Sequence, residues 1–254
     1  MFDPFGDYDS RGYLRNTAGE KDLEIIKIAE HELFRAQLPI ALDFLAQCKR
    51  IDYPDFLEVH RILFSALYPW SGKDRNTVLP ARSVSKGAVY FCHPKDCQRA
   101  IEEGLSFAQN KKQMAVRPGF IMGMFAYGHP FLDGNGRVML LVHAELCFRA
   151  NMSIDWISTD KTSYLEALTR EIEDPHAGAL DKYLHPFIGG KILRDQWLKR
   201  ISILPGLDGV NTGEDSSAQY ADPKVAENYL AFERRRDYKL AVENAIKLTQ
   251  DSKD

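Results

Sequence analysis

The feature of the sequence that most constrains the fold is a pair of apolar helical patterns joined by a short glycine-containing loop. The segment Gly119–Tyr127 has the periodicity of a buried helix, and Asn135–Ala150 is apolar around most of its circumference. A helix that is apolar on most sides has to be surrounded by other parts of the protein. The sequence therefore predicts a helical domain with the second of these helices at its centre.

Helical periodicity extends over much of the remaining chain. Pro39 is expected to kink or divide the first long helix, because proline lacks an N–H group and crowds the preceding turn. The β-prone residues between Thr77 and Phe91, which include Gly87, favour a short hairpin. Further helices are predicted at Lys21–Lys49, Pro54–Leu67, Asp96–Gln109, Thr162–Ile172, Leu180–Phe187, Gly190–Ile201 and from Pro223 onward. The predicted fold class is thus mainly α with one small β-hairpin.

The composition along the chain indicates four segments. Residues 1–49 form an N-terminal helical extension that begins with an irregular Gly- and Asp-rich stretch. Residues 50–204 form the main domain. Residues 205–222 are rich in Gly, Ser and Asp and are predicted to be a linker. Residues 223–254 are predicted to be a C-terminal helix with many charges.

Several classes of function are disfavoured by charge and hydropathy. The net charge is −3, which gives no basic excess for binding nucleic acid. No apolar run approaches the roughly 20 residues needed to span a membrane. The N-terminus lacks a secretory signal, so a cytoplasmic location is expected, with delivery into a host cell by a dedicated secretion system as the alternative.

Four cysteines are present, and two of them flank a histidine. The spacing from Cys92 through His93 to Cys97 matches no strong zinc pattern, and no second pair of ligands follows. Reduced thiols are therefore expected at Cys48, Cys92, Cys97 and Cys147.

The loop between the two apolar helices combines several groups suited to phosphate chemistry. Gly134 and Gly136 let the backbone turn tightly and approach a ligand closely. The N–H groups that open the following helix have no internal partners, so they form an anion site together with the helix dipole. Arg137 adds a forked cationic donor, Asp133 can hold Mg²⁺, and His129, in a loop expected to be exposed, can accept a proton near neutral pH. A plain helix–helix turn with a capping Asp and a surface His is disfavoured, because all these groups occur within nine residues.

This stretch, His-Pro-Phe-Leu-Asp-Gly-Asn-Gly-Arg at 129–137, resembles the signature of the Fic family, H-P-F-x-[D/E]-G-N-G-R. Weaker resemblances lie at Leu67–Arg75, Ser85–Pro94 and Tyr164–Leu168. The similarity covers roughly residues 50–190. It implies a Fic-type helical bundle with a small β-hairpin flap, and it makes residues 50–204 the Fic catalytic domain.

The resemblance also implies a role for each matching residue. His129 corresponds to the base that deprotonates a target hydroxyl, Phe131 to the residue that anchors the loop, and Asp133 to the Mg²⁺ ligand. The nucleotide's phosphates would lie against Gly134, Asn135, Gly136 and Arg137. The flap that aligns a target segment by strand addition corresponds to Ser85, Lys86, Gly87, Ala88, Val89 and Tyr90.

The implied activity is transfer of AMP from Mg-ATP to a Ser, Thr or Tyr hydroxyl of a target protein. One alternative is transfer of another phosphate-containing group, UMP, GMP or phosphocholine, from a diphosphate donor. The other is a non-catalytic module that binds a nucleotide or a partner protein. The sequence does not identify the target, because a flap of this kind binds main chain.

Two departures from the family pattern concern the donor and its regulation. Many members have a second arginine three residues after Arg137, where this chain has Leu140, so weak discrimination between nucleoside di- and triphosphates is expected. Many members also carry an inhibitory helix with [S/T]-x-x-x-E-[G/N], which no suitable segment of this sequence matches. Regulation by a separate inhibitory, antitoxin-like protein stays open.

Other candidate residues are interpreted as structural. The segment His185-Pro-Phe lacks the Asp and Arg of the loop and is expected to be a helix-end turn. Arg234–Arg236 is expected to be a solvated helix face. Core or surface positions without ligand partners are expected for His31, His60, His143 and His176.

Overall fold

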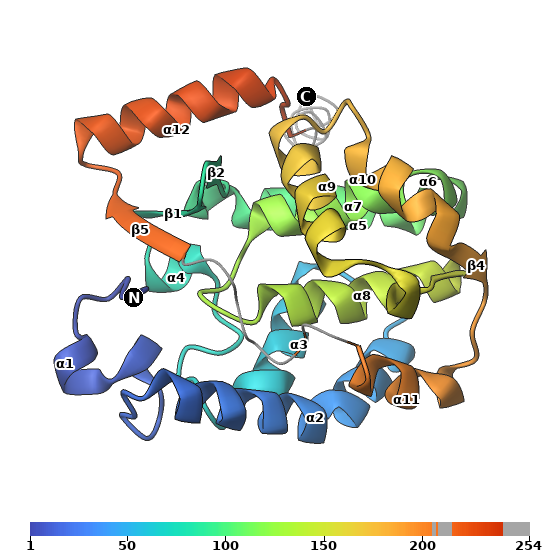
Figure 1. Cartoon of the computed structure of the whole chain (residues 1–254), viewed down its shortest axis with the longest axis horizontal. Coiled ribbons are helices and arrows are strands. Elements are labelled where there is room, and N and C mark those ends of the chain that lie inside the picture. Colours follow the sequence, from blue (N-terminus) through green and yellow to red (C-terminus); the bar gives the residue numbers. More distant parts are fainter. Residues whose placement is uncertain (205–206, 208–214, 241–254) are drawn as a thin grey trace, which may run out of the picture.

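The structure, a computed structural model, describes residues 1–204, 207 and 215–240. The prediction of a mainly α fold is confirmed (Figure 1). The helices are α1 (Tyr8–Arg11), α2 (Leu23–Gln47), α3 (Tyr53–Phe64), α4 (Arg75–Val78), α5 (Cys97–Gln109), α6 (Lys111–Val116), α7 (Pro118–Gly128), α8 (Asn135–Arg149), α9 (Lys161–Glu173), α10 (Ala179–Leu184), α11 (Trp197–Ser202) and α12 (Pro223–Arg236).

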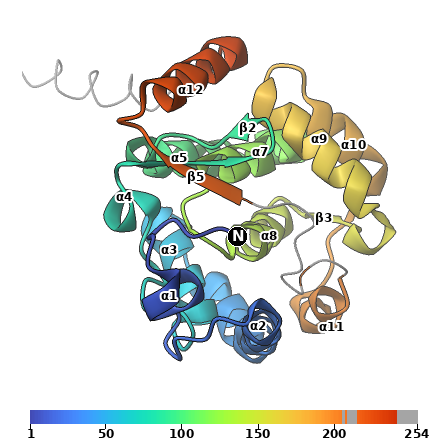
Figure 2. The same cartoon turned by 60° about the vertical axis from the view of Figure 1, so that its left-hand side comes forward.

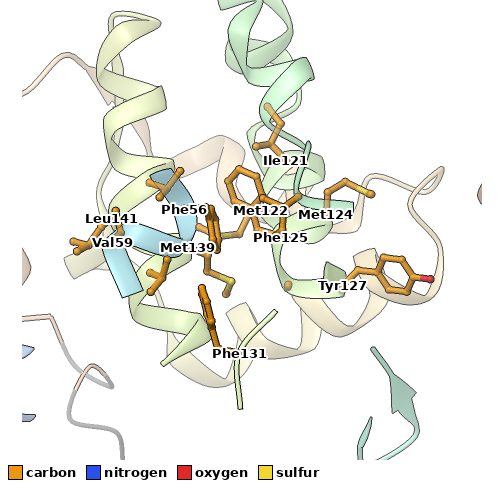
Figure 3. Close-up of a cluster of buried hydrophobic side chains, with 14 of the residues drawn as sticks. Phe56, Val59, Ile121, Met122, Met124, Phe125, Tyr127, Phe131, Met139 and Leu141 are labelled. Carbon is orange, nitrogen blue, oxygen red and sulfur yellow. The ribbon is translucent and has the colours of Figure 1, made fainter. Parts of the chain in front are cut away.

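The core surrounds α7 and α8, as their apolar sequences require. Every residue of α7 is buried, and α8 is buried on most of its circumference. Phe56 of α3 links α7 to the loop that follows it, because its ring centroid lies 5.3 Å from that of Phe125 and 6.1 Å from that of Phe131 (Figure 3). The loop between α7 and α8 is therefore fixed by an aromatic cluster beneath it.

Helix α2 is continuous, so the expected division at Pro39 is wrong. Proline at this position removes the N–H that would bond the carbonyl of Arg35. Both residues are on the exposed side of α2, where water can bond that carbonyl. One unbroken α2 then lies beside α3 and α8 at the lower edge of the view in Figure 1.

The β structure is more extensive than one hairpin. Strands β1 (Arg82–Lys86) and β2 (Val89–Tyr90) form the expected flap, and β5 (Asp215–Gln219) adds to β1 as a third antiparallel strand. A second small sheet pairs β3 (Met152–Ile154) with β4 (Ile188–Gly190). Residues 215–219 thus form a strand within the segment 205–222 that was predicted to be a linker, because backbone pairing selects them despite their polar composition. The helix expected at 190–201 is reduced to α11.

The last described helix, α12, packs on the domain through a charged residue. Arg236 is 2% exposed, lies 3.6 Å from the centroid of the Tyr127 ring and donates to the carbonyl oxygen of Ile172 over 3.0 Å. The expectation of a solvated Arg234–Arg236 face is thus wrong for Arg236. The predicted helix beyond residue 240 lies outside the described residues. None of the helices in the described part of the chain is both long and apolar enough to cross a membrane.

Candidate active site

Two left-handed backbone positions shape the loop between α7 and α8. His129 ends α7 with a φ of 38°, and Gly134 precedes α8 with a φ of 79°. A Cβ atom on Gly134 would lie 2.6 Å from the Phe64 ring. Glycine is therefore required at 134 both by its backbone conformation and by the space available.

Arg75 holds the first half of the loop from beneath. Its backbone N–H donates to the carbonyl of Pro130 over 2.7 Å, and its Nε donates to the carbonyl of His129, also over 2.7 Å. A third bond, 2.8 Å long, joins its Nη2 to the carbonyl of Cys92 beyond the flap. Arg75 is fully buried. In the sequence, Arg75 was notable only as the last residue of Leu67–Arg75, a segment with a weak resemblance to the Fic family. Its role in positioning the loop was therefore not predicted.

His60 holds the second half of the loop. Its ring lies under that of Phe131 with centroids 3.8 Å apart, and its Nδ1 accepts from the N–H of Gly72 over 2.9 Å. Burial lowers the pKa of His60 to about 3, so the ring is neutral. Its remaining proton is on Nε2, which lies 3.1 Å from the carbonyl oxygen of Asp133 and donates to it. Of the two expected positions, core or surface, His60 takes the core position. Its support of the loop was not predicted.

His129 is half-buried rather than exposed as expected. Its ring stacks on Phe91 of the flap with a centroid separation of 3.7 Å and an interplanar angle of 7°. Burial, and then the charges of Arg75 and Lys86, hold the pKa of His129 well below its usual range. The ring is therefore neutral at pH 7 and available as a base.

The side chain of Asn135 fixes the tautomer of that base. Its Oδ1 accepts from the N–H of Phe131 over 2.9 Å, and its Nδ2 donates to the carbonyl of the same residue over 2.8 Å. The Nδ2 also lies 3.1 Å from Nε2 of His129. Because Nδ2 can only donate, Nε2 of His129 carries the lone pair. The Asn135 side chain thus holds the loop through its hydrogen bonds to Phe131 and His129. Of Asn135, only the backbone N–H is then left for the expected anion site.

The start of α8 presents an anion site to open space. The first N–H groups of a helix have no partners within it, and those of α8 follow Gly134 at its N-terminus. A Cβ on Gly136 would meet nothing within 4 Å, so this side of the turn is open to a ligand. Arg137 is 5% exposed, and its Nη1 is buried without a hydrogen-bond partner among the residues that the structure describes. These groups fit an anion.

Two residues of α2 pair with the predicted phosphate and metal ligands. Lys27 Nζ lies 2.6 Å from Asp133 Oδ2 and 2.9 Å from Glu30 Oε2. Glu30 forms a close ion pair with Arg137, whose Nη2 also lies 3.4 Å from Asp133 Oδ1. The sequence predicted this helix from its apolar positions alone, so Lys27 and Glu30 were missed. Their only signal was two opposite charges three residues apart on a helix.

A cavity of about 400 Å³ joins these groups to an apolar region. His129, Asp133, Gly136 and Arg137 are among the polar residues that line it. Its apolar lining includes Leu140, Trp156, Tyr164, Leu165, Leu168 and Ile172. The volume is within the range of small-molecule sites. The lining can accommodate both an anionic group at α8 and a flat apolar group.

The flap places only some of its predicted residues at this cavity. Lys86 and Val89 line it. Gly87 takes the left-handed turn position, with a φ of 58°. Ser85 and Tyr90 contact the C-terminal part instead, because Ser85 Oγ lies 2.8 Å from Ser216 Oγ and the Tyr90 ring lies 5.9 Å from that of Phe232.

The cysteines form no metal centre in the described part of the chain. All four are free thiols, as expected, although Cys92 and Cys97 lie with their sulfur atoms 3.8 Å apart. Over residues 1–204, 207 and 215–240, no group of three or more His, Cys, Asp or Glu side chains is placed to hold a metal ion. A cation at Asp133 would therefore need further ligands from a bound donor.

Comparison with known proteins supports the resemblance seen in the loop. The model of the Fic/DOC family matches residues 50–147. The chain is 24% identical over 172 residues to a probable protein adenylyltransferase, y4lH, of Sinorhizobium fredii, covering 64% of this chain and 85% of that one. It is 26% identical over 169 residues to the protein adenylyltransferase VbhT of Bartonella schoenbuchensis, covering 65% of this chain but only 35% of VbhT.

Solved structures share the fold. The N-terminal Fic domain of a putative cell filamentation protein from Bartonella quintana, with bound ADP, has a TM-score of 0.59 at 18% identity, covering 75% of this chain and 96% of that one. BepC of Bartonella tribocorum, with bound AMPPNP, has a TM-score of 0.56 at 15% identity, covering 73% and 96%. The expected Fic-type helical bundle is thus confirmed. The family match identifies a Fic/DOC domain at residues 50–147, within a chain that is similar to protein adenylyltransferases over about two thirds of its length.

Proposed function

We propose that the chain transfers AMP from ATP to a Ser, Thr or Tyr hydroxyl of a target protein. The observation that carries this is one cavity that is lined by a neutral His129, the N-terminus of α8 and several apolar side chains. The base suits a target hydroxyl, the helix N-terminus suits the phosphates of the donor, and the apolar lining suits a nucleobase. The names of the curated relatives support adenylyl as the transferred group.

The residues would act as follows. Nε2 of His129 accepts the proton of the target hydroxyl while its oxygen attacks the α-phosphorus, and the bond from that phosphorus to the bridging oxygen of the departing pyrophosphate breaks. The N–H groups of Gly136 and Arg137, together with the Arg137 guanidinium, stabilise the charge that develops on the phosphate oxygens. Phe91 keeps the imidazole in its orientation by stacking, and the contact from Asn135 Nδ2 to Nε2 has to give way as Nε2 takes up the proton.

Mg²⁺ fits this site through Asp133. The charges of Lys27 and Arg137 hold the pKa of Asp133 below its usual value against the opposing effect of burial, so the carboxylate is ionised. Mg²⁺ in such sites commonly uses one or two carboxylates together with substrate phosphates and water. Bound there, the cation would offset phosphate charge, and Lys27 would have to give up part of its contact with Asp133.

Position-specific labelling of ATP tests this function. Label at the α-phosphate is expected to appear on proteins of a cell lysate, whereas label at the γ-phosphate is not, because pyrophosphate leaves. Transfer of γ-label would indicate a kinase and contradict the proposal. UTP, GTP and CDP-choline, each labelled at the group that would be transferred, should be compared in parallel. Leu140 stands where many Fic proteins have a second arginine, so a donor other than ATP is the second candidate. Binding of nucleotide without transfer from any donor would instead indicate a non-catalytic module.

Replacing Asp133 with alanine is expected to raise the Mg²⁺ concentration for half-maximal transfer by about tenfold to a hundredfold, since even the loss of an outer-shell partner of a metal has that effect. Asp133→Asn, which keeps one oxygen ligand, should fall between the variant and the wild type. Titrations of Mg²⁺ at saturating ATP measure this. An unchanged Mg²⁺ requirement in both variants would remove Asp133 from the metal site.

Replacing Leu140 with arginine is expected to tighten ATP binding by about tenfold to a hundredfold, the effect of one added charged hydrogen bond, and ADP binding much less. Leu140 is 9% exposed and lines the cavity one turn beyond Arg137. Calorimetry with both nucleotides decides this, with Leu140→Met as a control of similar volume. If the wild type already prefers ATP by well over about tenfold, another cation such as Lys86 or Lys161, which also line the cavity, holds the third phosphate.

The remaining expectations about partners and location stay predictions. Several proteins of similar structure are VirB-translocated effectors of Bartonella, which is consistent with delivery of this chain into a host cell. A separate inhibitory protein also stays a prediction, and co-purification from the native source would test it.

A further inference from the structure

The outer edge of the flap is occupied by the chain's own C-terminal part. Strand β5 pairs with β1 over five residue pairs, from Arg82 opposite Gln219 to Lys86 opposite Asp215. The N–H of Tyr220 extends this ladder by donating to the carbonyl of Ala81 over 3.0 Å. Figures 1 and 2 both show β5 alongside the flap. Strand addition to the flap is also the way in which a target segment is expected to bind.

We propose that residues 215–219 occupy the place of a target segment, with Asp215 where the target's acceptor residue would lie, opposite Lys86. This rests on the transfer function proposed above. A target must then present an extended segment that displaces β5, and its hydroxyl residue must come into register with Lys86.

The orientation of side chains along β5 supports this register. Successive side chains of a strand point to opposite faces. Ser216 faces outward, where its Oγ meets that of Ser85. Asp215 points the other way and is the residue of β5 that lines the cavity containing His129, Asp133 and Arg137. The position opposite Lys86 is therefore the one from which a side chain enters the catalytic cavity.

Asp215 occupies the position opposite Lys86 but cannot act as an acceptor in the transfer reaction. Its Oδ1 lies 3.7 Å from Lys86 Nζ. A carboxylate beside a lysine has no hydroxyl proton for His129 to accept. Ser217 is on the same face as Asp215, but its Oγ is buried two pairs further along the ladder, opposite Val84, and is not part of the cavity lining. The strand thus fills the target edge without offering a hydroxyl at the site of transfer.

Converting the occupant into an acceptor tests the register. Asp215→Ser is expected to make the purified chain label itself at residue 215 from α-labelled ATP, at a rate independent of protein concentration, as mass spectrometry would show. The wild type should carry no label at Ser216 or Ser217. Gln219→Ser, on the same face at the far end of β5, is the matched control and should stay unlabelled at 219. Label on lysate proteins without label at residue 215 of the variant would overturn the register.

Breaking the ladder tests the occupancy without relying on transfer. In an antiparallel ladder, every second residue of a strand bonds its N–H to the neighbouring strand. Because Tyr220 donates to Ala81, the N–H of Ala218 also points to β1, and that of Ser217 points away from it. A fluorescent peptide Asp-Ser-Ser-Ala-Gln-Tyr should therefore bind Ala218→Pro more tightly than the wild type, by about twofold to tenfold, the effect of one lost hydrogen bond.

Ser217→Pro is the control for that measurement, since its N–H does not enter the ladder, and it should resemble the wild type. Equal peptide binding by all three proteins, or by none, would overturn the occupancy of the edge by β5. If the peptide binds as expected but no protein transfers label from any donor, the transfer function fails while the occupancy of the edge stands.

Discussion

Replacing His129 with alanine is expected to lower the rate of transfer by about 10²- to 10⁴-fold, the usual contribution of a general base. Nε2 of His129 carries the lone pair, faces Asn135 and is held neutral in the cavity. Transfer of α-label to a target protein under single-turnover conditions measures this. Retention of more than a small fraction of the wild-type rate would mean that another group takes the proton.

A measurement of folding has to accompany that variant. Because His129 stacks on Phe91, its removal also costs packing, so the melting temperature of the variant should be compared with that of the wild type. The pH profile is a second readout. A pKa well below the ordinary value keeps the base unprotonated as the pH falls, so the wild-type rate should persist below about pH 6.5, where an unperturbed histidine would become half protonated.

Replacing Glu30 with alanine is expected to lower the free energy of unfolding by about 3–5 kcal/mol, as when one partner of a buried ion pair is removed. Glu30 is fully buried and pairs with Arg137 and Lys27. Without it, the carboxylate of Asp133, 3.4 Å away, is the anion left to the buried guanidinium among the described residues. Chemical denaturation measures the change. ATP should stabilise the variant more than the wild type, because phosphate supplies the anion that Arg137 has lost.

The same helix provides a matched control. Glu32 is exposed and pairs with Arg35 over 3.6 Å at the surface. Glu32→Ala should change the free energy of unfolding by less than about 1 kcal/mol, as exposed pairs do. Equal effects of the two substitutions would show that the Glu30–Arg137 pair contributes no net stability.

The local parts of the site were predictable because they lie within one short stretch of sequence. The glycines, the helix start and the charged residues between 129 and 137 each have a local physical reason. The central helix α8 was predictable for a similar reason, since its apolar circumference admits only a buried position. These features need no knowledge of which distant segments pack together.

The rest of the site depends on contacts between segments far apart in the chain. Lys27 and Glu30 meet the loop across more than a hundred residues, and an isolated charge pair on a helix gives no sign of its partner. Strand β5 was missed for the same reason. Its polar sequence has no strong β propensity, so its pairing with β1 was visible only once both were placed.

The ion pairs from α2 change what counts as the smallest intact enzyme. The family match begins at residue 50, and a fragment cut there would omit both Lys27 and Glu30. Arg137 and Asp133 would then lose the helix that covers them and would face solvent on that side. They would also lose the opposite charges of Glu30 and Lys27 with which they pair. Truncation studies and chimaeras of this protein should therefore keep α2 attached, since the recognisable domain is shorter than the unit that folds around Arg137 and Asp133.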